Sequence, residues 1–93
     1  MFTGYDLQAE CRVADPIVCR TYILGIVHGV MAGLSLRHQR FADIGVCFTE
    51  ETTSGDINAV VIGYMEANPK VLSRVATTVV LVALIEAFPC PVA

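Results

Sequence analysis

Four cysteines within 93 residues constrain this chain more than any other feature. They are Cys11, Cys19, Cys47 and Cys90, and an even number in so short a chain favours two disulfide bonds formed in an oxidising compartment. Zinc ligands usually include a pair of cysteines with about two to four residues between them, whereas no two cysteines here are closer than eight positions. Four buried free thiols are a further alternative. We therefore expect two disulfides.

The composition indicates one small folded domain. Hydrophobic residues make up 55% of the chain and charged residues 16%, whereas disordered chains have few aliphatic and many charged residues. A domain of this size buries only about 60–65% of its unfolded surface, so some aliphatic surface stays exposed and we expect an oligomer, with a homodimer as its expected form. With a net charge of −3 and no run of Lys or Arg, the chain lacks the basic surface of nucleic-acid-binding proteins.

A long helix is predicted from Pro16 to about His38. Asp15 can cap its free N–H groups, and proline is well tolerated in the first turn. Glycines recur every fourth residue along one side of this helix, and each costs about 1 kcal/mol relative to alanine. Such a stripe favours the close approach of another backbone, either within the domain or across a dimer interface. The glycines are Gly25, Gly29 and Gly33.

Three shorter helices complete the prediction. Residues 53–56 resemble a capping box, and apolar residues follow at helical spacing. This helix ends at Asn68, because Pro69 cannot continue it, and Asn68 can cap a last helix that runs to about Phe88. A short helix over residues 5–13 comes first. The sequence thus predicts an all-α, disulfide-stapled bundle of about four helices with a C-terminal helical hairpin.

Apolar residues on the last helix bear on association and on membranes. Leu81 and Ile85 extend a polar side of this helix with apolar groups, and we assign them, with the three glycines, to helix packing or a dimer interface. The longest apolar stretch, residues 75–88, is shorter than the roughly 20 residues that span a bilayer. We therefore expect no membrane insertion.

The helix order limits which cysteines can pair. Cys19 lies near the start of the long helix and Cys47 beyond its far end. Because the Cα atoms of a disulfide lie within about 7 Å of each other, these two cysteines cannot pair. If the last two helices form an antiparallel hairpin, the chain returns Cys90 to the end of the bundle at which the hairpin begins, and Cys47 lies at that end. The expected pairs are then Cys47 with Cys90 and Cys11 with Cys19.

We find no catalytic constellation in the sequence. His28 and His38 are ten positions apart on one helix, so they cannot form a metal pair. A cysteine held in a disulfide is not a nucleophile, and no phosphate-binding glycine loop or G-x-S-x-G motif occurs. The chain is therefore predicted to be no enzyme and to need no cofactor or metal.

A predicted loop over residues 41–56 is acidic, and no Lys or Arg occurs between Arg40 and Lys70. Charge on a loop often serves solubility alone. A loop tethered at Cys47 is presented rigidly, however, which lowers the ordering cost of binding. The candidate contacts for a basic partner are Asp43, Glu50, Glu51, Thr52 and Asp56.

Four segments carry a recognisable pattern: residues 19–25 (CRTYILG), 46–48 (VCF), 60–69 (VVIGYMEANP) and 83–91 (ALIEAFPCP). In this order, and with four cysteines, they make the sequence resemble the Rap/Tai immunity proteins of bacterial type VI secretion systems. The resemblance covers most of the chain from Cys11 onward. The chain departs from the family pattern at Thr21, where glycine is usual, and at Thr49, where proline is usual.

The resemblance implies a periplasmic, often dimeric helical protein that binds and blocks a secreted peptidoglycan amidase. The amidase supplies the catalytic residues, and a loop of the immunity protein can enter its cleft, which we assign to residues 43–56 as a hypothesis. Because residues 1–11 lack the features of a secretory signal, a periplasmic location implies that a signal was removed. A small periplasmic stress chaperone with an apolar dimer interface is the alternative, and a structural homodimer without a client is a third.

Overall fold

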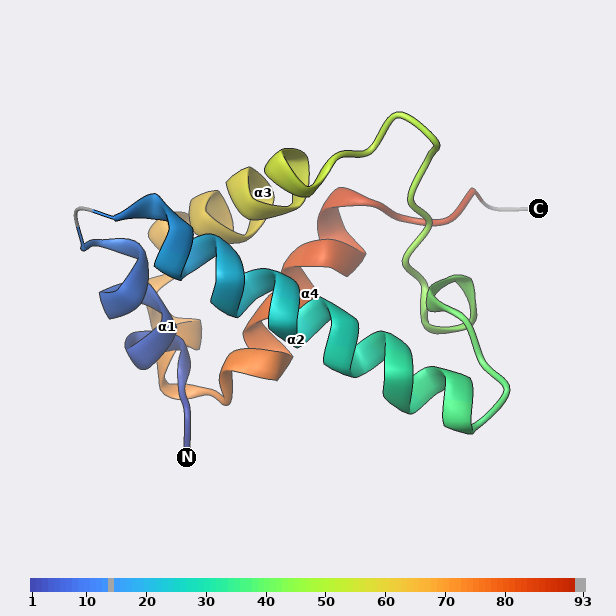
Figure 1. Cartoon of the computed structure of the whole chain (residues 1–93), viewed down its shortest axis with the longest axis horizontal. Coiled ribbons are helices and arrows are strands. Elements are labelled where there is room, and N and C mark those ends of the chain that lie inside the picture. Colours follow the sequence, from blue (N-terminus) through green and yellow to red (C-terminus); the bar gives the residue numbers. More distant parts are fainter. Residues whose placement is uncertain (14, 92–93) are drawn as a thin grey trace.

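The computed structural model describes residues 1–13 and 15–91 (Figure 1). Within them lie six helical segments, two of which are short 3₁₀ helices. They are α1 (Gly4–Cys11), α2 (Pro16–Leu36), η1 (Phe41–Ile44), α3 (Ser54–Ala67), η2 (Pro69–Ser73) and α4 (Ala76–Ala87). The predicted all-α class is confirmed.

The helices start where the sequence offers caps. At α1, the Thr3 hydroxyl accepts from the Asp6 backbone N–H, and the Asp6 carboxylate accepts from the Thr3 N–H at 2.8 Å. At α2, Asp15 Oδ1 accepts from the Ile17 N–H at 3.0 Å. A second capping box over residues 53–56 begins α3. Each cap satisfies N–H groups that the first helical turn leaves without partners.

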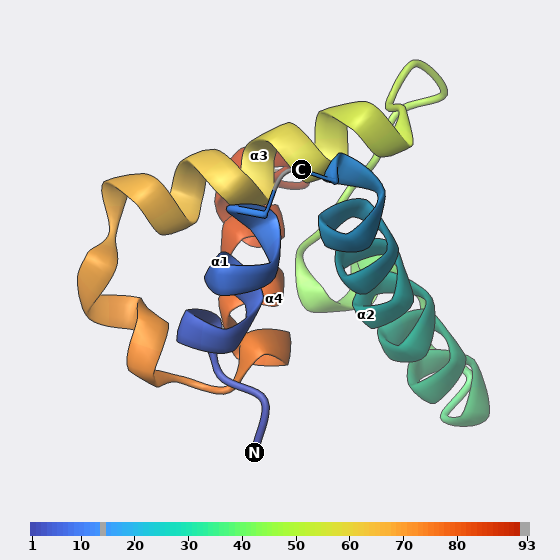
Figure 2. The same ribbon diagram turned by 60° about the vertical axis from the view of Figure 1, so that its left-hand side comes forward.

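The core forms around α4, which α1, α2 and α3 all contact. Figure 2 shows α1 in front of α4, α3 across its upper end and α2 alongside. Every helix of the bundle contributes side chains with no exposed surface: Leu7, Ile23, Val61, Val80 and Leu84. Burying such aliphatic side chains is the main favourable contribution to folding.

The last helix begins later than the sequence predicts. After η2, Arg74 is extended, and α4 starts only at Ala76. The N-terminal segment is the reason, because it takes the backbone hydrogen bonds of this stretch: Gly4 N–H donates to the Arg74 carbonyl at 2.8 Å, and Ala76 N–H donates to the Phe2 carbonyl at 2.9 Å. Asn68 also differs from its predicted role. Its side-chain amide donates to the Tyr64 carbonyl at 2.9 Å, so it caps the end of α3.

Gly4 allows this close contact between α1 and η2. A Cβ atom at this position would lie 2.8 Å from the Leu72 Cα atom and 3.1 Å from Val79 Cγ2. Backbone cannot yield as a flexible side chain can, so only glycine fits here without displacing η2.

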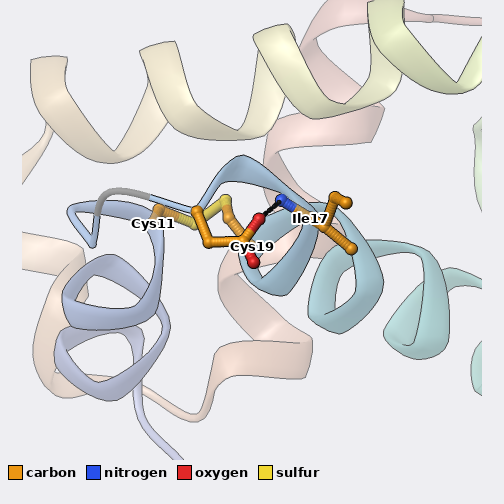
Figure 3. Close-up of a disulfide and its surroundings, with 4 residues drawn as sticks. Cys11, Ile17 and Cys19 are labelled. Atoms are coloured by element: carbon orange, nitrogen blue, oxygen red, sulfur yellow. Dashed lines mark hydrogen bonds between the residues drawn. A yellow bond between two sulfur atoms is a disulfide. The ribbon is translucent and has the colours of Figure 1, made fainter.

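Two disulfides join Cys11 to Cys19 and Cys47 to Cys90, with Cα–Cα distances of 4.4 and 4.9 Å. This is the pairing expected from the helix order. The first bridge ties the end of α1 to the first turn of α2, beside the hydrogen bond at Ile17 (Figure 3). The second joins the loop before α3 to the segment after α4.

The two bridges should differ in their effect on stability. They close loops with sequence separations of 43 residues for Cys47–Cys90 and 8 residues for Cys11–Cys19. The chain-entropy relation then gives about 4 and about 2.5 kcal/mol. We expect the paired serine substitution at 47 and 90 to lower the urea midpoint more than the one at 11 and 19. Equal midpoints for the two double variants would contradict this order.

Candidate functional site

The acidic loop projects from the bundle between η1 and α3, where the yellow-green trace extends beyond the helices in both views (Figures 1 and 2). It contains a turn over residues 49–52, called here the acidic turn. The Thr52 N–H donates to the Thr49 carbonyl at 3.1 Å, and the Thr49 N–H donates to the Thr52 hydroxyl at 3.0 Å. Glu50 and Glu51 occupy the two central positions of this turn and are exposed.

The residues before the acidic turn fix it to the bundle. Val46 is 1% exposed, and the Cys47 N–H donates to the Phe88 carbonyl at 2.8 Å, next to the disulfide to Cys90. Phe48 packs edge-on against the rings of Phe41 and Phe88, with centroid distances of 5.4 and 5.2 Å. These are favourable geometries for aromatic pairs.

On the other side, the acidic turn runs directly into the capping box of α3. The Thr53 N–H donates to the Asp56 carboxylate at 2.9 Å, and the Asp56 N–H donates to the Thr53 hydroxyl at 3.1 Å. The turn is therefore held between a disulfide and a helix start. Such a loop has little conformational freedom left to lose on binding.

The five predicted contact residues divide into two groups. Asp43 accepts from the Arg40 N–H at 2.7 Å and Asp56 caps α3, so both carboxylates serve the local fold, and the half-buried Thr52 closes the acidic turn. Glu50 and Glu51 carry no side-chain hydrogen bond within the described residues. Among the five predicted contacts, these two carboxylates are the ones left available to a partner.

The described residues contain no group of three His, Cys, Asp or Glu side chains placed to hold a metal ion. All four cysteines are in disulfides, so none is available as a nucleophile. What the site offers is a fixed, exposed pair of charges, which suits it to contact with another protein.

A family model for Rap1a immunity proteins matches residues 3–90, a range that includes every helix and all four cysteines. The chain belongs to this family. Membership implies an immunity protein whose partner is a secreted effector. No curated protein and no solved structure matches the chain.

A second surface of the immunity protein is the exposed side of α2. A Cβ atom at Gly25, Gly29 or Gly33 would meet no atom of the described residues within 4 Å. The prediction that the glycine stripe packs against another backbone inside the domain is therefore wrong, because these glycines face open space. The dimer interface, the other alternative for these glycines, stays a prediction.

Large apolar side chains accompany the glycines on α2. Ile17 is 67% exposed, Tyr22 42% and Leu36 85%. A shallow apolar groove of about 420 Å³ runs along the N-terminal half of the helix, lined by Ile17, Val18, Thr21, Tyr22, Gly25 and Ile26. On α4, Leu81 is half-buried and Ile85 is 40% exposed. An apolar surface of this kind is typical of a site of association.

By length and composition, α2 also qualifies as a candidate membrane span. Its 21 residues include an 18-residue window of mean hydropathy 1.6, of which 17% is buried. The apolar stretch singled out in the sequence, residues 75–88, contains α4, whose 12 residues are too few to span a bilayer. Core helices of soluble proteins and signal sequences meet the same criterion.

Measurements of unfolding free energy can test which side chains of this region hold the local fold and which are left available to a partner. Because Glu50 and Glu51 are exposed and without hydrogen bonds in the described structure, changing both to glutamine should alter the free energy of unfolding by less than about 0.5 kcal/mol. Thr53→Ala removes the hydroxyl that caps α3 and should cost about 1 kcal/mol. Urea unfolding measures both effects, and a larger loss from the glutamine pair would contradict the assignment.

Proposed function

We propose that this immunity protein acts in the periplasm, where it binds a peptidoglycan amidase delivered by a type VI secretion system and occludes its active site. The observation that carries the proposal is the acidic turn, which presents Glu50 and Glu51 from a rigid base. The chain itself then needs no catalytic group, because inhibition requires only that the turn fill or cover the cleft of the effector. The two disulfides fit an oxidising compartment.

Charge would contribute mainly to the rate and specificity of association. Residues 41–69 contain five carboxylates and no Lys or Arg, so the field around the acidic turn attracts a basic surface. Single exposed ion pairs are worth only about 0–1 kcal/mol. The rigid turn adds affinity by a different route, since little ordering cost remains on binding.

Charge reversal tests this contact. Changing Glu50 and Glu51 to lysine should weaken binding of the cognate effector by about 10- to 100-fold, chiefly through slower association. The matched control reverses Glu66 and Glu86, which are exposed on α3 and α4 outside the acidic loop, and changes the net charge equally. Surface plasmon resonance with the purified effector gives both rates.

The binding measurements distinguish the role of the acidic turn from the proposed inhibitor role as a whole. Equal weakening by the two lysine pairs would mean that net charge alone matters, and the acidic turn would be rejected as the specific contact. If the unaltered protein fails to bind the effector, the proposed inhibitor role itself is contradicted.

We further propose that two copies associate through the exposed side of α2. This surface suits pairing with a second copy of itself. The glycines along its middle leave room for the bulky side chains at the two ends of the same surface on the other copy. Residues 16–42 contain no carboxylate, so the acidic charge of the protein lies outside this segment.

An arginine on the glycine stripe tests the dimer. Gly29→Arg places a charged side chain in the proposed interface and should convert a dimer to a monomer in sedimentation-velocity experiments. Gly63→Arg is the control, since Gly63 is also an exposed helical glycine with no atom of the described structure near its Cβ position. Dissociation by both variants, or a monomeric starting protein, would contradict an interface on α2.

A further inference from the structure

A small cavity lies between the start of α2 and the middle of α3, away from the acidic turn and from the glycine stripe. Its volume is about 120 Å³, and it is lined by Cys11, Pro16, Cys19, Arg20, Asn58 and Ile62. Figure 3 shows the disulfide that forms one wall of it, with α3 passing above the bridge.

Asn58 is the unusual member of this lining. It is 7% exposed, and neither its Oδ1 nor its Nδ2 atom has a hydrogen-bond partner within the described structure. It shares the buried face of α3 with Val61 and Met65, a position where an apolar residue would avoid the cost of an unpaired amide. A buried polar group without a partner calls for a ligand, a water or an ion that completes it.

The chemistry of the amide restricts the ligand. Asn58 offers one acceptor and a donor beside it in the same plane. A primary carboxamide has the matching donor and acceptor on the same side, so two parallel hydrogen bonds can form. A trans peptide group carries its N–H and C=O on opposite sides, and a carboxylate has no donor, so each leaves one Asn58 atom unpaired.

Arg20 can supply the remaining interaction. Its exposed side chain lines the same cavity and forms no salt bridge with a carboxylate of residues 1–13 or 15–91. A carbonyl oxygen has two lone pairs, so the ligand carbonyl can accept from Arg20 as well as from Asn58. The cavity volume is about four times the roughly 30 Å³ of a water molecule in the liquid, enough for one carboxamide group.

We propose that this cavity binds a primary carboxamide, held by paired hydrogen bonds to Asn58 and by the guanidinium of Arg20. The same group occurs on the Asn or Gln side chain of a protein and on small free amides. The proposal is independent of the acidic turn and of the identity of the effector.

Nuclear magnetic resonance of the full-length oxidised protein tests the proposal. Acetamide is the probe, and it should shift the side-chain NH₂ signals of Asn58 and the Nε signal of Arg20 saturably, with a dissociation constant on the order of 10 mM, as expected for a ligand of four heavy atoms. Acetate and N-methylacetamide, which lack the paired donor and acceptor, should bind at least about 10-fold more weakly. Equal shifts with all three compounds, or no saturation with acetamide, would overturn the assignment in favour of ordered water.

Two variants separate binding from folding. Asn58→Leu should abolish the acetamide response while raising the urea midpoint, because it removes an unpaired buried amide. If that variant does not fold, Arg20→Gln, at an exposed position, should weaken acetamide binding several-fold and leave the midpoint unchanged; an unaltered acetamide affinity there would contradict the role of Arg20. Titration with the effector identifies the source: a shift of the Asn58 signals indicates a protein side chain, and no shift indicates a free carboxamide.

Discussion

The disulfide between Cys47 and Cys90 holds the two ends of the C-terminal half of this molecule together. It joins two segments 43 residues apart and brings the loop before α3 against the end of α4. The Val46–Pro89 backbone pairing and the three packed phenylalanines surround it, so covalent, hydrogen-bonding and aromatic contacts hold the same junction. In a domain this small, such a junction replaces part of the stabilisation that a larger core would supply.

The bridge also fixes the acidic turn, which we propose as the inhibitory contact. The turn starts two residues after Cys47 and ends one residue before the cap of α3, so neither end can move without breaking the junction or the helix start. Flexible acidic loops are common and often have no specific role. A fixed pair of carboxylates at a turn is different, because its geometry exists before the partner arrives.

Local signals explain how far the sequence alone could predict this structure. The caps at Asp15 and Thr53 and the proline at 69 act through neighbouring residues, so the helix starts at Pro16 and Ser54 and the end of α3 were predictable. The late start of α4 was not, because it depends on hydrogen bonds to Phe2 and Gly4, at least 70 residues away. A local sequence pattern does not show which distant residues will form such hydrogen bonds.

The same limit applies to the surfaces. Spacing placed the glycines of α2 on one side but could not say whether that side meets α4 or solvent, and the structure leaves it open to solvent. Asp43 and Asp56 looked equivalent to Glu50 and Glu51 as charges, yet their hydrogen bonds to nearby N–H groups assign them to the local fold. Asn58 gave no sequence signal, since a polar residue within an amphipathic helix normally faces solvent.

Hydrogen–deuterium exchange of the immunity protein with and without its effector shows which surface the effector covers. If the acidic turn is the inhibitory contact, backbone amides of residues 47–53 should exchange more slowly in the complex, while the exposed side of α2 keeps its exchange rates. Protection confined to α2, with unchanged exchange in residues 47–53, would rule out the acidic turn as the inhibitory contact.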